Sequence, residues 1–204
     1  MGTVDLNLAA ELRDCLGLNR AVETGTFRGD TALSLSGVFS AVVSIELSDE
    51  WHRRASGRLR GTTVQVLRGH SVEHLPALAA ERVPTLYYLD GHWSGANTAG
   101  AEDECPVIEE IHAIGAGHPN DCVIIDDARL FLSSPRPPHD PAKWPTIVEV
   151  FDALREHREG HALTVLGDQV IAVPLVAKPL IDTYGRSLEP RSTLASRVAA
   201  TLRR

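Results

Sequence analysis

The stretch Ala21-Val22-Glu23-Thr24-Gly25-Thr26-Phe27-Arg28-Gly29-Asp30-Thr31 decides the fold of this chain. It reads as a short buried strand that breaks into a glycine-containing turn and then opens a helix. Glycine allows the backbone to approach another group where a Cβ atom would collide. The first N–H groups of the following helix have no partner within that helix and favour an anionic group. The stretch therefore predicts a ligand site directly after the first strand.

A second expected strand, 41–47, carries the carboxylate of Glu46 near its end, about 20 residues after the turn. Nucleoside-binding βαβ units place an acid here to accept hydrogen bonds from the ribose hydroxyls. A dinucleotide site needs G-x-G-x-x-G, but Phe27 stands at the second glycine position. The loop therefore suits a nucleoside ligand without phosphate, such as S-adenosylmethionine. The alternative is that Gly25 and Gly29 only form a tight strand-to-helix turn.

Composition and charge limit the classes of function. The 204 residues, 43% of them hydrophobic and 23% charged, suffice for one α/β domain with a sizeable core. The net charge of -7 argues against nucleic acid as a partner, because that binding needs a basic face. No apolar run approaches the roughly 18 residues of a membrane span, and early acids interrupt any export signal. Three cysteines without metal-ligand spacing predict a reduced, cytoplasmic setting.

Strand and helix patterns alternate along the chain. Strands are expected at 20–24, 41–47, 63–67, 85–90 and 122–127, and a closing hairpin at 162–166 and 169–174. Helices are expected at 5–16, 29–38, 49–59, 71–78, 103–116 and 145–158. This order predicts a doubly wound, mostly parallel seven-stranded α/β sheet with a C-terminal antiparallel hairpin. We expect one domain at 1–177 and a tail at 178–204 with a helix near 190–202, while the proline-rich segment 133–141 predicts an irregular loop.

Parallel strands deliver their carboxyl ends, and the residues that follow, to one edge of the sheet. Here these residues are Glu23 to Gly25, Glu46, the Gly69-His70-Ser71 turn, Asp90-Gly91-His92-Trp93 and Asp126-Asp127. His92 is the candidate general base and Asp90, two residues earlier, the second catalytic candidate. The alternative is that His92 is structural. Trp93 is expected either to line the ligand pocket or to fill core.

Five segments resemble class I S-adenosylmethionine-dependent methyltransferases. They are Val22 to Thr31, Ile45 to Ser48, Leu89 to Gly95, Cys105 to Glu110 and Ile124 to Arg129, and the resemblance as a whole covers about 22–175. The pattern looks like one group of this fold whose substrates are largely unassigned. More distantly, it is similar to metal-dependent O-methyltransferases of the catechol and macrocin-sugar types.

The resemblance implies a set of cofactor-binding residues. In the family the turn at 69–71 flanks the adenine, although an acid commonly stands where this chain has His70. The implied S-adenosylmethionine site contains Glu23, Gly25, Thr26, Phe27, Gly29, Thr31, Glu46, Leu47, Gly69, His70, Ser71 and Asp90.

The metal-dependent relatives imply a magnesium site as well. They hold Mg²⁺ with an acid after strand four and an acidic pair after strand five, and Asp90, Asp126 and Asp127 occupy the matching positions. When three carboxylates lie close together, the pKa of at least one of them rises unless a cation lies between them. A bound Mg²⁺ would in turn lower the pKa of a substrate hydroxyl that it coordinates. Two alternatives stay open. Arg28, Arg129 and the sulfonium supply the positive charge, or one aspartate of the pair caps a turn.

We therefore expect a methyltransferase that uses S-adenosylmethionine to O-methylate a small molecule, such as a natural-product or sugar hydroxyl, with assistance from Mg²⁺. The expected partner is the small-molecule acceptor, with no nucleic acid and no membrane, and a homodimer is the assembly to test. An NAD-type oxidoreductase or epimerase is disfavoured by Phe27 and by the terminal hairpin. A ligand-binding protein that keeps the methyltransferase fold without turnover is the third class.

Overall fold

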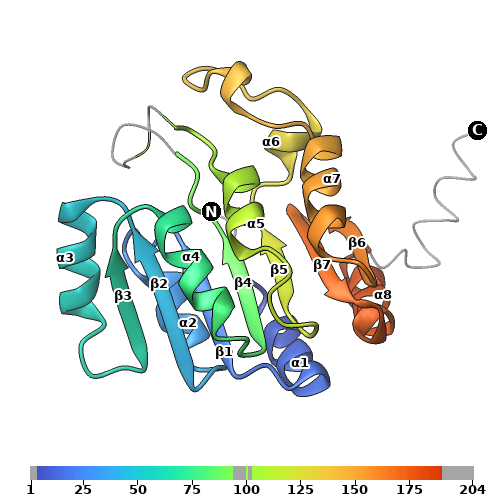
Figure 1. Ribbon diagram of the computed structural model, residues 1–204, viewed down its shortest axis with the longest axis horizontal. Helices are drawn as coiled ribbons and strands as arrows, with labels where there is room; N and C mark the ends of the chain where they lie inside the picture. The colour runs from blue at the N-terminus through green and yellow to red at the C-terminus, as the bar shows by residue number, and fades with distance from the viewer. Residues whose placement is uncertain (1–3, 94–99, 101–102, 190–204) are drawn as a thin grey trace, which may run out of the picture.

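A computed structural model describes residues 4–93, 100 and 103–189 (Figure 1). Its seven-stranded sheet has the order β3-β2-β1-β4-β5-β7-β6. The strands β1 to β5 are parallel, whereas β7 runs antiparallel to both β5 and β6. The predicted α/β sheet and its closing antiparallel hairpin are therefore confirmed. The strands are β1 (Arg20–Thr24), β2 (Ala41–Glu46), β3 (Val64–Arg68), β4 (Thr85–Leu89), β5 (Cys122–Ile125), β6 (His161–Leu166) and β7 (Gln169–Pro174).

Helices cover both faces of the sheet (Figure 1). On one face, α1, α2, α3 and α8 share a core cluster with the strands, and on the other face α4, α5 and α7 share a second one. The helices are α1 (Leu6–Leu16), α2 (Asp30–Leu35), α3 (Asp49–Arg58), α4 (Ser71–Ala80), α5 (Val107–Ile114), α6 (Arg129–Leu132), α7 (Ile147–His157) and α8 (Lys178–Leu188), with short 3-10 turns η1 (Pro141–Lys143) and η2 (Leu175–Ala177).

The central strands are apolar on both sides because both faces of the sheet are covered. Alternate residues enter opposite cores: Ala21 and Tyr88 lie in the cluster beneath α1, and Val22 and Tyr87 lie in the cluster beneath α5. All four are fully buried. These continuous buried runs fix where β1 and β4 end, and so they fix where the residues after them emerge.

Local sequence sets the helix boundaries. Ser48 caps α3 by accepting the Trp51 N–H. The helix α5 is shorter than the predicted 103–116, because Pro106 at its N-cap and Gly115 at its C-cap (φ 56°) delimit it. The helix α6 was not predicted. The helix α8 packs on α1 and η2, and the predicted helix near 190–202 lies outside the described residues.

Within the described part of the chain, no helix combines the length and apolar character needed to cross a bilayer.

Candidate active site

The ends of the parallel strands meet at one edge of the sheet, below the loop that follows α6 (Figure 1). Backbone hydrogen bonds continue the sheet just beyond the strands. Gly25 N–H donates to the Ile45 carbonyl (2.9 Å), Gly69 N–H to the Glu46 carbonyl (3.0 Å) and Asp126 N–H to the Leu89 carbonyl (3.0 Å). The structure therefore brings the predicted strand-end residues together on this edge.

The two glycines of the turn after β1 make close approaches within the protein. A Cβ atom at Gly25, whose φ is +81°, would lie 2.2 Å from the carbonyl oxygen of Asp90. One at Gly29, whose φ is +79°, would lie 2.9 Å from Cδ1 of Leu59. Glycine at position 25 thus lets the turn press against the end of β4, and it brings the predicted cofactor loop directly beside Asp90.

Glu46 organises this loop from the end of β2. Its Oε2 accepts the Phe27 N–H and its Oε1 accepts the Ser48 N–H, both at 2.7 Å. The first bond helps to hold Phe27 at a positive φ of 46°, with its ring 4.2 Å from the ring of Trp51. Each carboxylate oxygen has a second lone pair, so the group is still able to accept a ribose hydroxyl. The adjoining Leu47 is exposed.

Glu23 lies beneath the loop rather than on its surface, with 1% of its area exposed. The Ser44 hydroxyl donates to its carboxyl group, and the Thr26 hydroxyl lies 2.6 Å from the Ser44 hydroxyl. Burial raises the pKa of Glu23 to about 8, and hydrogen bonds from Ser44 and Thr31 only partly oppose this. Glu23 therefore connects β1, β2 and the predicted loop residues through one buried polar network.

Asp127 is bound by two cationic side chains. Its Oδ2 lies 2.8 Å from His92 Nε2, and its Oδ1 lies 2.5 Å from Arg129 Nη1. Burial alone would raise the pKa of Asp127, but these hydrogen bonds and charges outweigh it and hold the pKa well below its usual range. Asp168, in the hairpin turn between β6 and β7, accepts the Arg129 N–H (2.9 Å) and also pairs with its guanidinium.

The other two predicted carboxylates lie beside this group. Asp90 Oδ1 is 3.7 Å from His92 Nδ1, and burial raises the pKa of Asp90 to about 7, with the charges of Asp126 and Asp127 adding to the effect. Asp126 is 2% exposed and accepts the Tyr88 hydroxyl at 2.8 Å. Its second oxygen, Oδ1, has no hydrogen-bond partner among the described residues.

The three aspartates do not fit a magnesium site in this arrangement. Both oxygens of Asp127 already contact cationic groups, and one of the two Asp126 oxygens accepts the Tyr88 hydroxyl. In the described ranges, Asp90, Asp126 and Asp127 do not bring one oxygen each within 4.8 Å of the others. Arg129 supplies positive charge to Asp127, which agrees with one of the alternatives that the sequence analysis left open. The Arg28 guanidinium lies instead 5.2 Å from the Phe27 ring.

Glu110 joins the site from α5 and was not predicted. It is 1% exposed, and burial raises its pKa to about 7. Its Oε1 would lie 2.9 Å from a Cβ at Gly91, and it borders a cavity of about 10 Å³, room for about one water molecule, that also contacts His92. One signal was available, because Glu110 interrupts the apolar stripe of Val107, Ile111 and Ile114.

A second unpredicted residue, Glu104, attaches the proline-rich loop to the site. It accepts the Trp144 indole N–H at 2.9 Å and the Asp140 N–H at 3.1 Å. The Trp144 ring then lies 5.4 Å from the ring of His92, and the half-buried Trp93 lies 5.4 Å from His139. The loop thus forms an aromatic wall beside His92. Glu104 and Trp144 are 40 residues apart, so no local pattern could have paired them.

The turn after β3 lies at the same edge. His70 is the N-cap residue of α4 and lies 3.5 Å from Asp103, while the buried Ser71 begins the helix. Gly69 has a φ of +134°, and a Cβ there would lie 2.8 Å from the ring of His74.

The buried acids predict a pH dependence of stability. Burial raises the pKa values of Glu23, Asp90 and Glu110 to about 8, 7 and 7. Between about pH 5 and pH 8 the folded protein therefore holds protons that the unfolded chain has lost, so the free energy of unfolding falls as pH rises. His92, with its pKa also raised, acts in the same direction, whereas Asp127 acts only in more acidic solution.

We expect the ligand-free protein to lose about 2 kcal/mol or more between pH 5 and pH 8, measured by urea unfolding. Glu23→Gln should flatten this dependence, while Glu73→Gln, an exposed acid on α4, should leave it unchanged. A free energy of unfolding that rises over this range would contradict the assignment.

Comparison with known proteins places the fold. No protein-family model and no curated protein matches the chain. An O-methyltransferase from Bacillus cereus in complex with SAH matches with a TM-score of 0.58 and 15% identity over 85% of this chain and 82% of the other. The O-methyltransferase TomG from Streptomyces achromogenes, involved in tomaymycin synthesis and in complex with SAM, matches with a TM-score of 0.54 and 18% identity over 83% and 79%.

The chain has the class I methyltransferase fold. The family resemblance predicted this fold from its motifs, and the antiparallel β7 is the feature that distinguishes it from a dinucleotide-binding sheet. In the methyltransferase fold, as in other open α/β sheets, ligands bind outside the carboxyl ends of the strands. This is the edge at which Glu46, Asp90 and His92 lie.

Proposed function

We propose that the chain is an S-adenosylmethionine-dependent methyltransferase that methylates a hydroxyl group of a small molecule. The observation that carries this proposal is the cofactor-type loop after β1, held by Glu46 and pressed against Asp90. A nucleoside would contact the Glu46 carboxylate, while the methionine part would lie along the turn toward β4. The predicted homodimer and cytoplasmic setting stay predictions.

The charge of the site supports a cationic cofactor. Glu23, Glu110 and Asp126 are buried at or beneath this edge and Asp90 is half-buried, and burial raises the pKa values of Glu23, Asp90 and Glu110. The described cationic groups His92 and Arg129 both bind Asp127. A sulfonium bound beside Asp90 would therefore be stabilised by neighbouring carboxylates.

His92 is the group that would receive the acceptor proton. Its Nε2 faces Asp127, so the neutral ring donates Nε2–H to that carboxylate and keeps its lone pair on Nδ1. The bound cofactor would supply a methyl group to the acceptor oxygen, with the electrons of the carbon–sulfur bond returning to sulfur. His92 Nδ1 would take up the hydroxyl proton. The aromatic wall of Trp144 and His139 would exclude water and orient the acceptor.

Calorimetric titration with S-adenosylhomocysteine and, separately, with NAD tests the cofactor class. We expect binding of the first and none of the second, since Phe27 occupies the position where pyrophosphate would need glycine. Binding of NAD alone would support the oxidoreductase alternative. Binding of S-adenosylhomocysteine without turnover of any hydroxyl acceptor would support a ligand-binding protein instead.

Glu46→Ala is expected to weaken S-adenosylhomocysteine binding by about 1.5–3 kcal/mol, the range for a hydrogen bond to a charged group. Part of this loss would come from release of the Phe27 N–H that Glu46 accepts. Glu50→Ala on the exposed side of α3 serves as the control and should bind normally. Unchanged affinity of the Glu46 variant would disprove the ribose contact.

A further inference from the structure

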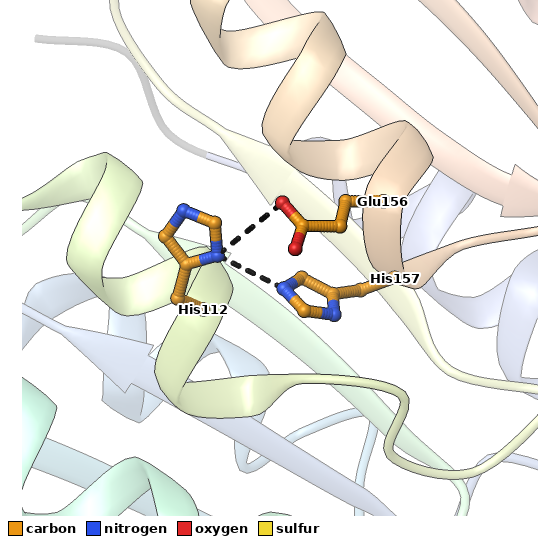
Figure 2. Close-up of side chains that lie close together, drawn as sticks. All are labelled: His112, Glu156 and His157. Atoms are coloured by element: carbon orange, nitrogen blue, oxygen red, sulfur yellow. Dashed lines mark hydrogen bonds and ion pairs between the residues drawn. The ribbon is translucent and has the colours of Figure 1, made fainter.

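Three side chains with metal-binding groups meet between α5 and α7, outside the candidate active site (Figure 2). His112 lies in the last turn of α5, and Glu156 and His157 lie in the last turn of α7. His112 Nδ1 is 2.9 Å from His157 Nε2 and 4.0 Å from Glu156 Oε2. Within the described ranges, this is the one set of three His, Cys, Asp or Glu residues whose ligand atoms all lie within 4.8 Å.

The chemistry of this set matches a borderline-soft divalent ion. Two imidazole nitrogens and one carboxylate oxygen form a ligand set that Zn²⁺ takes together with a water molecule in the fourth position. In tetrahedral geometry, with bonds of 2.0–2.1 Å, neighbouring ligand nitrogens lie about 3.3 Å apart. The observed 2.9 Å needs only a small separation of the two rings. The exposed Glu156 side chain is able to rotate inward from 4.0 Å.

The surroundings favour a cation at this point. Both helices end here, and their unpaired terminal carbonyl groups carry the negative end of the helix dipole. The neighbouring arginines are engaged elsewhere: Arg155 pairs with Asp152, and the buried Arg158 lies 3.7 Å from Asp121. The helices beneath the three ligands are fixed by a shared core, so the ligands are held close together before any ion binds.

We propose that His112, Glu156 and His157 bind a divalent transition-metal ion of the zinc type, which cross-links the C-terminal ends of α5 and α7. The ion would stabilise the packing of α5, the helix that also carries the buried Glu110. The competing explanation is a hydrogen bond between the two imidazoles that joins the helices without a metal.

Calorimetric titration of untagged protein with ZnCl₂ near pH 7.5 tests the site. We expect one ion per chain, and His112→Ala and His157→Ala should each weaken binding by about 100-fold or more, at least the loss seen when residues supporting a metal ligand are removed. Zn²⁺ at about 100 times its wild-type Kd should raise Tm by roughly 5 °C in the wild type and by about 1 °C or less in these variants. Because His112 is exposed, its replacement should leave the fold intact.

Matched variants separate this site from others. Glu156→Gln should weaken binding, whereas Asp152→Asn, one turn earlier on α7, should not. His52→Ala on α3 and Cys15→Ser on α1 should also bind normally. With Co²⁺ in place of Zn²⁺, the visible absorption of a four-coordinate ion should appear and be lost in His157→Ala. Absence of zinc binding by the wild type, or binding by His112→Ala and His157→Ala as tight as that of the wild type, would overturn the proposal and leave the imidazole hydrogen bond.

Discussion

Replacement of His92 by alanine is expected to lower the rate of methyl transfer by about 100-fold or more, the range for loss of a general base. Burial opposes the imidazolium, but the hydrogen bond to Asp127 and the charges of Asp90, Asp127 and Asp126 outweigh it and raise the pKa of His92. At a given pH, a larger fraction of the free enzyme therefore carries a protonated His92 than an ordinary histidine would, and this form cannot accept a proton. Wild-type activity should rise with pH as that proton is lost, and the rate of His92→Ala should recover partly in alkaline solution.

The variant Asp127→Asn keeps the imidazole of His92 but changes the charge beside it, so it tests how that charge sets the pH dependence of the reaction. The change removes the charge that raises the pKa of His92, so the rising limb of the kcat/KM profile should move to lower pH. Measurement of the His92 pKa by NMR, in the wild type and in Asp127→Asn, tests the same shift without an acceptor substrate. Including EDTA in every assay separates the role of His92 from that of any metal ion. Normal turnover by His92→Ala, or an unmoved profile in Asp127→Asn, would contradict the proposed role.

Gly25→Ala is expected to lower the free energy of unfolding by about 3 kcal/mol and to abolish cofactor binding. An alanine at a φ of +81° costs about 1–2 kcal/mol. Its Cβ would also lie 2.2 Å from the backbone oxygen of Asp90, an overlap that adds about 1–3 kcal/mol as the loop and the end of β4 move apart.

Gly17→Ala is the matched control for this change. Gly17 also has a positive φ, +65°, but a Cβ there would have no atom within 4 Å. Urea unfolding of both variants should therefore give a clearly larger loss for Gly25→Ala, and only that variant should lose S-adenosylhomocysteine binding. Equal losses would show that the contact with Asp90 is not what requires glycine at position 25.

The sequence predicted the parts of the fold that rest on local patterns. The buried runs of β1, β2, β4 and β5 and the turn Gly167-Asp168 each combine apolar periodicity with an unambiguous breaker. The boundaries of α5 were predicted less well, since the helical spacing extended past Pro106. The short α6 has too few residues for its periodicity to be read.

The candidate site was predicted in outline, because parallel strands deliver their ends to one edge whatever the side chains do. Which groups pair there depends on contacts between distant segments. The ion pair of Arg129 with Asp168, the contact of His92 with Asp127 and the bond of Trp144 to Glu104 each join residues 35 to 40 positions apart. Three aspartates in a row of strand ends suggested a metal, whereas the structure shows one of them between an imidazole and a guanidinium.

The position of β7 also affects the order in which the chain acquires its shape during synthesis. The strand β7 lies between β5 and β6, so β5 is an unpaired edge until residues 169–174 have been made. Asp168, which holds Arg129, arrives with the same hairpin. A nascent chain that has already folded β1 to β4 would therefore still expose the backbone of β5. It would also lack the Asp168 contact that holds Arg129 beside the Asp126-Asp127 pair. The last hairpin both covers the backbone of β5 and completes the pocket edge, so assembly of the site comes late in translation.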